Sequence, residues 1–185
     1  MAEPNPSSTE SQELITLLRQ RSGFSVGDAI PRPIPSKKEA LSLLHFLDFS
    51  PHIIKHQEAV MRKALDLAHH IKSIPINLDL IRAGALLHDI GRLRSHDLDH
   101  TAYGGDLLRT LGFPEELARI AETHGLGGIT PEEAIELGIP VRDYNPKTIE
   151  EKIVCLADKY LSGTDRVDIE GRFKRWLEKY GETPF

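Results

Sequence analysis

The sequence predicts an all-α fold, a helical bundle that carries a short N-terminal appendage and a C-terminal helix. Three observations lead to this prediction. From Ser36 onward, apolar residues recur three and four positions apart, as they do along one face of a helix. Residues that favour helix starts precede most of these stretches, and no stretch shows the alternation of a half-buried strand. The length of 185 residues fits one domain with room for an appendage.

Residues 1–35 form the predicted N-terminal extension, which we expect to be partly disordered. Residues 1–9 are polar and rich in proline and serine. A short helix is expected from Ser11 to Arg21, followed by a glycine- and proline-rich link. The first residues have neither the basic start nor the apolar core of a signal peptide. Since no apolar run approaches the roughly 20 residues of a membrane helix, we expect no membrane association and a cytoplasmic location.

Residues 36–163 are predicted to form the main domain, and most of its helices begin at residues suited to a first turn. The predicted helices run from Ser36 to Leu47, from Ser50-Pro51 to Ile71, from Asn77 to Gly91, from Asp99 to Leu111, from Pro114 to His124, from Pro131 over a few residues, and from Thr148 to Leu161. Gly91 is expected to end the third helix. Thr148 and Glu151 have the spacing of a capping box.

Residues 164–185 form the predicted C-terminal tail, a helix that packs on the domain. Phe173, Trp176, Leu177 and Tyr180 lie at helical spacing and share one face of this helix. Apolar stripes of this kind are more often packing surfaces than ligand sites, and we interpret this one as packing.

Composition narrows the classes of function. The net charge of −5 gives no overall basic field, which argues against nucleic acid as a partner. Cys155 is the single cysteine, so a disulfide within the chain and a zinc site of several thiolates are both excluded. A reduced, cytoplasmic setting agrees with this cysteine usage.

Four histidines and two aspartates face the interior of the predicted bundle. Each lies at helical spacing from apolar residues of its own helix, and they come one or two to a helix. The six residues are His56, His88, Asp89, His100, His124 and Asp158.

The two inward-facing carboxylates need compensation for their charge. Few basic residues share the helix faces of Asp89 and Asp158, and an unpaired buried carboxylate is costly and tends to protonate. Asp89 also falls in the last turn of its predicted helix, where the helix dipole disfavours negative charge. A divalent metal ion held by the carboxylates and by neutral imidazoles removes this cost. The alternative is a set of hydrogen-bonded core histidines and of aspartates that link helices.

The remaining histidines are less well placed for such a site. His45 and His69 are expected at the surface, and His70 lies too far along its helix to join the same ion. His52, one turn before a candidate ligand, and His96, in the loop after the His-Asp pair, are candidates for contact with the ligands or the substrate.

The order of these residues resembles the signature of a known family. His56, the run Leu87-His88-Asp89-Ile90-Gly91 and Asp158 resemble the H…HD…D signature of the HD-domain metal-dependent phosphohydrolases, in the HDIG subtype. The His100-x-x-x-Gly104 stretch and the Leu111–Glu116 stretch before His124 are similar to the same subtype, and Ser50–His56 looks like small uncharacterised, mainly archaeal HD proteins.

This resemblance covers about residues 38–163 and implies an HD-domain helical bundle with a metal centre. By this resemblance, one divalent ion is held by His56, His88, Asp89 and Asp158, and Asp89 bridges to a second ion held also by His100 and His124. One or two ions are therefore expected. Manganese, iron, zinc, nickel, cobalt and magnesium are all candidates, because the ligand types do not separate them.

Two departures from the family pattern affect the expected substrate. Arg92 stands after Ile-Gly, where the family often has lysine. Gly125-Leu-Gly-Gly-Ile follows His124, where cyclic-di-GMP phosphodiesterases have a Gly-Tyr-Pro element. The second departure argues against cyclic-di-GMP as the substrate.

The expected activity is hydrolysis of a small phosphorylated substrate, such as a nucleotide or another phosphomonoester or phosphodiester, by a metal-activated water at Asp89. Lys159, Arg92 and Arg94 are the candidate cations for the phosphoryl charge, with Lys159 first. An ordinary surface charge is the alternative for each of them. Glu122 or Asp97 is the candidate proton donor, with plain solvation as the alternative.

Two other functions stay open. Some HD-fold proteins oxidise a substrate with two irons in the same kind of site, and others sense a nucleotide without catalysis. A homodimer is also left open. Ligand identity does not separate the iron alternative from hydrolysis, since histidine and aspartate suit several metals. The complete ligand set speaks against the sensor, because a binding module need not keep an open hydrolytic site.

Overall fold

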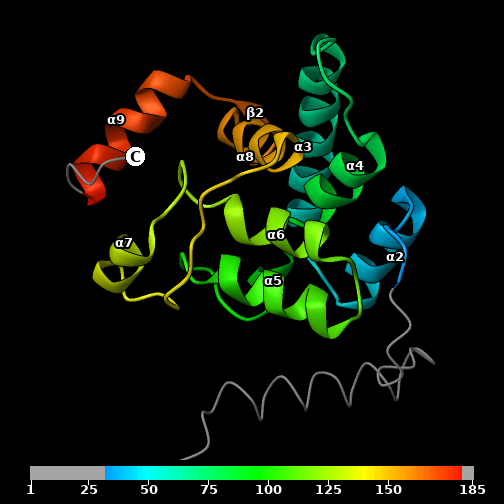
Figure 1. Cartoon of the computed structure of the whole chain (residues 1–185), viewed down its shortest axis with the longest axis horizontal. Coiled ribbons are helices and arrows are strands. Elements are labelled where there is room, and N and C mark those ends of the chain that lie inside the picture. The colour runs from blue at the N-terminus through cyan, green and yellow to red at the C-terminus, as the bar shows by residue number, and fades with distance from the viewer. Residues whose placement is uncertain (1–31, 181–185) are drawn as a thin grey trace, which may run out of the picture.

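The computed structural model describes residues 32–180, which form the helical bundle of Figure 1. The predicted helix from Ser11 to Arg21 lies outside these residues. The described elements are α2 (Lys37–Phe46), α3 (Pro51–His70), α4 (Leu78–Leu87), the 3₁₀ helix η1 (Ile90–Leu93), α5 (His100–Thr110), α6 (Glu115–Thr123), α7 (Pro131–Glu136), α8 (Ile149–Lys159), β1 (Leu161–Ser162), β2 (Asp165–Arg166) and α9 (Ile169–Tyr180). The predicted all-α fold is confirmed. Among the described helices, none combines the length and apolar character needed to cross a membrane.

The bundle is built around α3, its longest described helix, which packs against α4 and α8. A second pair, α5 and α6, packs side by side, and α6 also contacts α4 and α8. Figure 1 shows α9 at the edge of this bundle, reached from α8 through the short β1–β2 hairpin. Helices α3, α4, α5, α6 and α8 therefore present their inner faces to one another.

Local side-chain hydrogen bonds define where the first helices begin. The Ser36 hydroxyl accepts from the Glu39 amide at 3.3 Å, and the Glu39 carboxylate accepts from the Ser36 amide at 2.8 Å, which closes a capping box at α2. The Ser50 hydroxyl caps α3, with Pro51 as its first helical residue. Asn77 caps α4 by accepting from the amide of Leu80 at 3.0 Å. These starts agree with the prediction.

Three predicted helix starts differ in detail. Pro114 is the N-cap of α6 and not its first helical residue. Asp99 precedes α5, but its carboxylate accepts from the Ser95 hydroxyl at 2.5 Å and makes no cap hydrogen bond. Thr148 caps α8, yet the Glu151 carboxylate accepts from an amide outside the cap, so the capping box does not close.

Gly91 does not end α4, contrary to the prediction. The helix ends at Leu87 with His88 as its C-cap, and Gly91 lies within η1. A Cβ at Gly91 would lie 1.9 Å from the carbonyl oxygen of His100 and 2.6 Å from the amide nitrogen of Gly104. Glycine is therefore required here because η1 passes directly against the backbone of α5.

A short antiparallel hairpin follows α8, although the sequence predicts no strand. Leu161 pairs with Arg166 and Ser162 with Asp165. Gly163 in the turn has φ of +60°, which favours glycine. Strands of two residues are too short to show the alternation by which strands are recognised in a sequence.

The apolar residues form two clusters. The larger one fills the space among α2, α3, α4, α6 and α8. The smaller one gathers around Tyr144 and Ile129, and Trp176 of α9 packs against it. Trp176 therefore has a packing contact, as the sequence predicts for its stripe, whereas Leu177 on the same helix is 43% exposed.

Candidate metal centre

The six inward-facing residues meet where the packed helices converge. They come from five packed segments: His56 from α3, the adjacent pair His88 and Asp89 from the end of α4, His100 from the start of α5, His124 from the C-cap of α6 and Asp158 from α8. Four of them, His88, Asp89, His100 and His124, are almost fully buried. Sequence periodicity predicts their inward direction, and the structure places them together.

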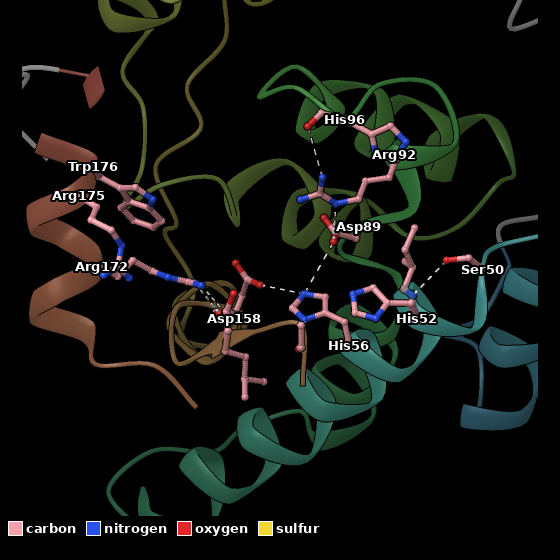
Figure 2. Close-up of a pocket in the computed structure, with 14 residues that line it drawn as sticks. Ser50, His52, His56, Asp89, Arg92, His96, Asp158, Arg172, Arg175 and Trp176 are labelled. Atoms are coloured by element: carbon pink, nitrogen blue, oxygen red, sulfur yellow. Dashed lines mark hydrogen bonds and ion pairs between the residues drawn. The ribbon is translucent and has the colours of Figure 1, made fainter. Parts of the chain in front are cut away.

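The first group consists of His56, His88 and Asp158. The Asp158 Oδ1 atom lies 3.2 Å from His56 Nε2 and 3.6 Å from His88 Nε2. The ligand-type atoms of these residues lie close enough to one another to share an ion. His56 and Asp158 line a cavity of about 730 Å³ (Figure 2), so this group is open to a small molecule.

The second group consists of His100 and His124, with Asp89 between the two groups. Asp89 Oδ1 lies 3.1 Å from His100 Nε2 and 3.3 Å from His124 Nε2. Its other oxygen, Oδ2, lies 3.8 Å from His56 Nε2 and 3.7 Å from His88 Nε2. The two oxygens of one carboxylate therefore face two adjoining sets of imidazoles, and His88, Asp89 and His124 also lie close enough to one another to share an ion.

Backbone carbonyls fix the orientation of all four imidazoles. Each Nδ1 atom lies within hydrogen-bond distance of a backbone carbonyl oxygen. The pairs are His56 with Gly163 at 2.7 Å, His88 with Ala85 at 2.8 Å, His100 with Asp97 at 2.5 Å and His124 with Ala121 at 2.8 Å. Because a carbonyl accepts and never donates, each Nδ1 must carry the hydrogen. In a neutral imidazole, the Nε2 atom then has a free lone pair. All four lone pairs are therefore available as metal ligands.

This arrangement leaves buried acceptors that face one another. His100 Nε2 and His124 Nε2 lie 3.0 Å apart, and burial lowers the pKa of His124 to about 4, so its ring is neutral at neutral pH. Within the described residues, the buried atoms His88 Nε2 and Asp89 Oδ1 have no hydrogen-bond partner. Buried acceptors without donors are costly, and a divalent cation satisfies them together. The donor set, imidazole nitrogens oriented by backbone carbonyls plus carboxylates, fits a metal of this kind.

Lys159, one of the candidate catalytic residues, lies beneath the centre rather than at the surface. The residue is 3% exposed, and its ammonium donates to the carbonyl oxygen of His124 and to Asp158 Oδ2, the latter at 3.1 Å. Burial raises the pKa of Asp158, but the charge of Lys159 lowers it, and this pKa lies well below its usual value. The surface alternative for Lys159 is therefore wrong.

Arg92 lies beside the Asp89 carboxylate. Its Nε atom is 2.7 Å from Asp89 Oδ2, and its side chain lines the large cavity. Arg94, the other candidate of this stretch, instead places its guanidinium 4.1 Å from the centre of the Tyr103 ring. Of these two arginines, Arg92 is the one that reaches the candidate site.

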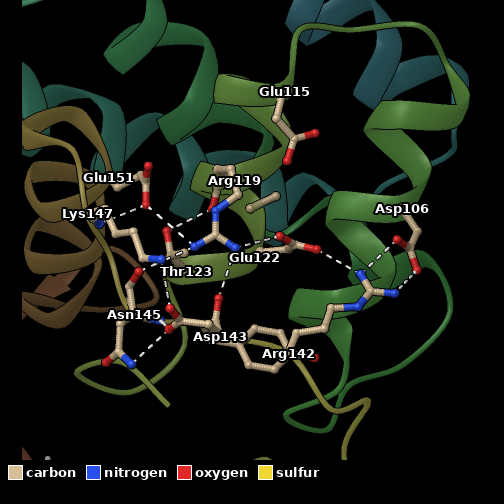
Figure 3. Close-up of polar contacts among 12 residues, drawn as sticks. Asp106, Glu115, Arg119, Glu122, Thr123, Arg142, Asp143, Asn145, Lys147 and Glu151 are labelled. Atoms are coloured by element: carbon tan, nitrogen blue, oxygen red, sulfur yellow. Dashed lines mark hydrogen bonds and ion pairs between the residues drawn. The ribbon is translucent and has the colours of Figure 1, made fainter. Parts of the chain in front are cut away.

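Glu122 is neither solvated nor directed at the centre, contrary to the alternatives that the sequence offered. Its carboxylate is 2% exposed and accepts from Arg109 at 2.7 Å. It also accepts from Arg142 at 2.7 Å and from Arg119 at 3.0 Å (Figure 3). A carboxylate engaged by three guanidiniums is a structural tie and a poor proton donor. Asp97, the other candidate donor, is exposed and lines a smaller cavity of about 220 Å³ beside the centre.

The large cavity has a wall that the sequence reasoning missed. Arg172, Arg175 and Trp176 of α9 line it opposite Arg92 (Figure 2). His52 and His96, which were expected near the ligands or the substrate, also line it. The signal available in the sequence was the spacing of three and four positions that puts these three residues on one face of a helix.

Comparisons with known proteins add the family. The HD domain family matches residues 53–163. An uncharacterised protein of Methanocaldococcus jannaschii is 47% identical over 147 residues, which are 78% of this chain and 86% of the relative. A tRNA (cytidine(56)-2'-O)-methyltransferase of Picrophilus torridus is 41% identical over 80% of this chain, which spans 41% of that relative. A ribonuclease Y of Thermosipho melanesiensis is 28% identical over 56% of this chain and 18% of its own length. No solved structure matches the chain.

The matched segment, 53–163, contains all six candidate ligands and Gly163, whose carbonyl orients His56, whereas α9 lies beyond it. The helical architecture and the His/Asp cluster agree with the resemblance noted in the sequence. The chain therefore belongs to the HD domain family, within the superfamily of metal-dependent phosphohydrolases.

Proposed function

We propose that this protein is a metal-dependent phosphohydrolase that acts on a nucleotide or on another small phosphomonoester or phosphodiester. The observation that carries the proposal is the convergence of four imidazole lone pairs and two carboxylates beside an open cavity. Such a set of acceptors calls for cations. Family membership supports hydrolysis of a phosphate ester as the chemistry.

A bound divalent metal supplies a water with a lowered pKa and a Lewis acid for the phosphoryl oxygens. The position of Asp89 supports two ions, since its two oxygens face the His56–His88 side and the His100–His124 side separately. Asp158 completes the ligands on the first side.

Two basic residues have different roles in this proposal. Arg92 lines the cavity and is held by Asp89, so its remaining N–H groups are placed to bind a phosphoryl oxygen of the substrate. Lys159 is engaged by the His124 carbonyl and by Asp158, and we assign to it the positioning of these two ligands. This assignment replaces the first choice made from the sequence, in which Lys159 binds the phosphoryl group itself.

A phosphodiester of RNA is the second candidate substrate. Two kinds of relatives, ribonuclease Y and a tRNA methyltransferase, bear the names of enzymes that act on RNA. The net charge of −5 weighs against tight binding of a long polyanion. We therefore place RNA second to a small nucleotide.

The test combines metal analysis with an activity panel. Metal-free protein is loaded separately with manganese, iron, cobalt, nickel, zinc or magnesium and is assayed on nucleoside phosphates, cyclic nucleotides and short RNA. We expect turnover with at least one metal and none without metal. Asp89→Asn should lose bound metal and lower the activity by more than about a hundredfold, since even outer-sphere changes cost ten- to hundredfold. The control Asp66→Asn, at an exposed site of α3, should retain both.

Full metal content and full activity in Asp89→Asn would contradict the proposal. Oxygen uptake with the EPR signal of a mixed-valence iron pair would identify an oxygenase instead. Tight nucleotide binding without turnover, whichever metal is loaded, would identify a sensor.

A further inference from the structure

Helix α9 contributes a basic wall to the cavity above the metal centre. Arg172 and Arg175 lie one turn apart, and Trp176 follows them on the same side of the helix. In Figure 2 these three side chains point from α9 toward Asp158 and His56. All three line the 730 Å³ cavity, which reaches the candidate ligands on its other side.

Neither of these two arginines forms an ion pair with a carboxylate of the described residues. Among the described residues, no carboxylate oxygen lies within 4.0 Å of either guanidinium. Arg172 instead donates to two backbone carbonyls, of Asp158 at 3.2 Å and of Leu161 at 2.5 Å, which hold it in place. Arg175 is exposed on the cavity side.

Other arginines of the chain show the contrast. Arg109 donates to Glu115 at 2.6 Å and to Glu122 at 2.7 Å, and Arg142 donates to Asp106 at 2.8 Å. These guanidiniums are neutralised within the fold. Two guanidiniums that face a cavity without such neutralisation favour an oxyanion from outside, because the planar N–H pairs match phosphate oxygens in a bidentate manner.

We propose that Arg172 and Arg175 form a second anion subsite, which binds a phosphoryl group of the substrate other than the one that is hydrolysed. The inference rests on the proposed function, which places the reacting phosphate at the metal centre beside Arg92. The ligand class is then a small compound with two phosphoryl groups. The subsite belongs to α9, beyond the segment 53–163 that matches the family, so it sets the specificity of this chain rather than the chemistry of the centre.

The test uses metal-loaded protein and alkane bisphosphonates of increasing chain length, each compared with the alkylphosphonate of the same length. Carbon–phosphorus bonds resist hydrolysis, so binding is measured apart from turnover by calorimetry. We expect one chain length at which the bisphosphonate binds about tenfold more tightly than its partner with one phosphonate. The fluorescence of Trp176, the single tryptophan of the chain, should change with that ligand because it lies beside both arginines.

Two variants test whether α9 is responsible for the tighter binding of the bisphosphonate. Arg175→Ala should remove the advantage of the bisphosphonate and leave the affinity for the single phosphonate unchanged. The matched control is Lys174→Ala, which removes the same charge from an exposed position that does not line the cavity. The control should keep the advantage.

Three outcomes would overturn the subsite: no advantage at any chain length, an advantage that survives Arg175→Ala, or an equal loss in Lys174→Ala. These outcomes are separate from failure of the proposed function. A protein that hydrolyses phosphate esters without the bisphosphonate advantage retains the function and loses the subsite. A protein that binds the bisphosphonate more tightly but hydrolyses no phosphate ester retains the subsite and loses the proposed function.

Discussion

His124 shows how single residues of the centre are held. Its Nδ1 donates to the Ala121 carbonyl, its own carbonyl accepts from Lys159, and its Nε2 is directed at Asp89 Oδ1, 3.3 Å away. The ring therefore has one orientation and one tautomer before any ligand binds. The same device, a backbone carbonyl at Nδ1, recurs at the other three histidines. Preorientation of this kind raises metal affinity because less freedom is lost on binding.

Replacement of Lys159 tests its role in positioning. Lys159→Met keeps the volume and removes a buried cation that engages the His124 carbonyl and Asp158. We expect a loss of about 2–3 kcal/mol in the free energy of unfolding and weaker metal binding, since Asp158 loses a charge-assisted hydrogen bond. Thermal unfolding and metal titration measure the two effects. Lys152→Met, at an exposed position of α8, is the control that should change neither.

At the residue scale, periodicity predicted the inward direction of the candidate ligands but not the burial of Lys159 and Glu122. His88, Asp89, His100 and His124 are buried as their spacing indicates. Periodicity does not tell which buried carboxylate meets a metal site and which meets arginines. Glu122 lies on the buried side of α6, but its partners Arg109 and Arg142 come from other segments, and no local pattern reveals that contact. That these residues hold metal stays a proposal.

The close passage of η1 over α5 is the element-scale feature on which the centre depends. Asp89 precedes η1 and His100 begins α5, so the distance between them is set where Gly91 meets the α5 backbone. A side chain at Gly91 would push the two elements apart. Asp89 would then lose its alignment with His100 and His124.

Gly91→Ala measures this dependence. The added Cβ would lie 1.9 Å from the His100 carbonyl oxygen. This oxygen belongs to the backbone of α5, which cannot move aside as a flexible side chain can. We expect a loss of about 3 kcal/mol or more of stability, together with reduced metal content. In Gly138→Ala the Cβ meets nothing within 4 Å, so only the cost of its positive φ of +68° applies, about 1 kcal/mol. Denaturant unfolding that shows equal losses for both variants would contradict this account.

Helix starts were predictable and some ends were not, for a physical reason. A start such as Ser36 or Ser50 is fixed by a hydrogen bond to an amide three residues along, which the local sequence encodes. The end of α4 depends on contact with α5, and the β1–β2 hairpin depends on pairing over two residues. Such tertiary contacts leave little trace in a short window of sequence.

At the scale of the whole molecule, the Glu122 cluster ties α5, α6 and the segment after α7 together. Burial raises the pKa of Glu122, but the hydrogen bonds and charges of Arg109 and Arg142 outweigh it and leave this pKa below its usual 4.5. A carboxyl whose folded pKa is lowered stabilises the fold fully above the unfolded pKa. That contribution is lost as the pH falls from about 4.5 through the folded pKa.

Glu122→Gln tests this linkage. At neutral pH we expect the variant to be about 2 kcal/mol less stable, because the three arginines, each partly exposed, lose their shared charge partner. Urea unfolding of both proteins over a pH series gives the difference directly. The gap should narrow as the solution becomes more acidic than about pH 4.5, and a gap that stays constant would show that the charge of Glu122 does not contribute.

Gly163 has two roles in the molecule. Its carbonyl orients His56, and it is the last residue of the segment that matches the HD family. Past this point the chain needs only the rest of a hairpin to reach the helix that bears Arg172 and Arg175. Gly163 therefore joins the segment that carries the candidate metal ligands to the segment that carries the proposed anion subsite. Under the two proposals made above, a change in the segment after the hairpin would alter the bound compound and leave the candidate metal ligands in place. Grafting a foreign terminal helix after residue 166 offers a protein engineer the same freedom.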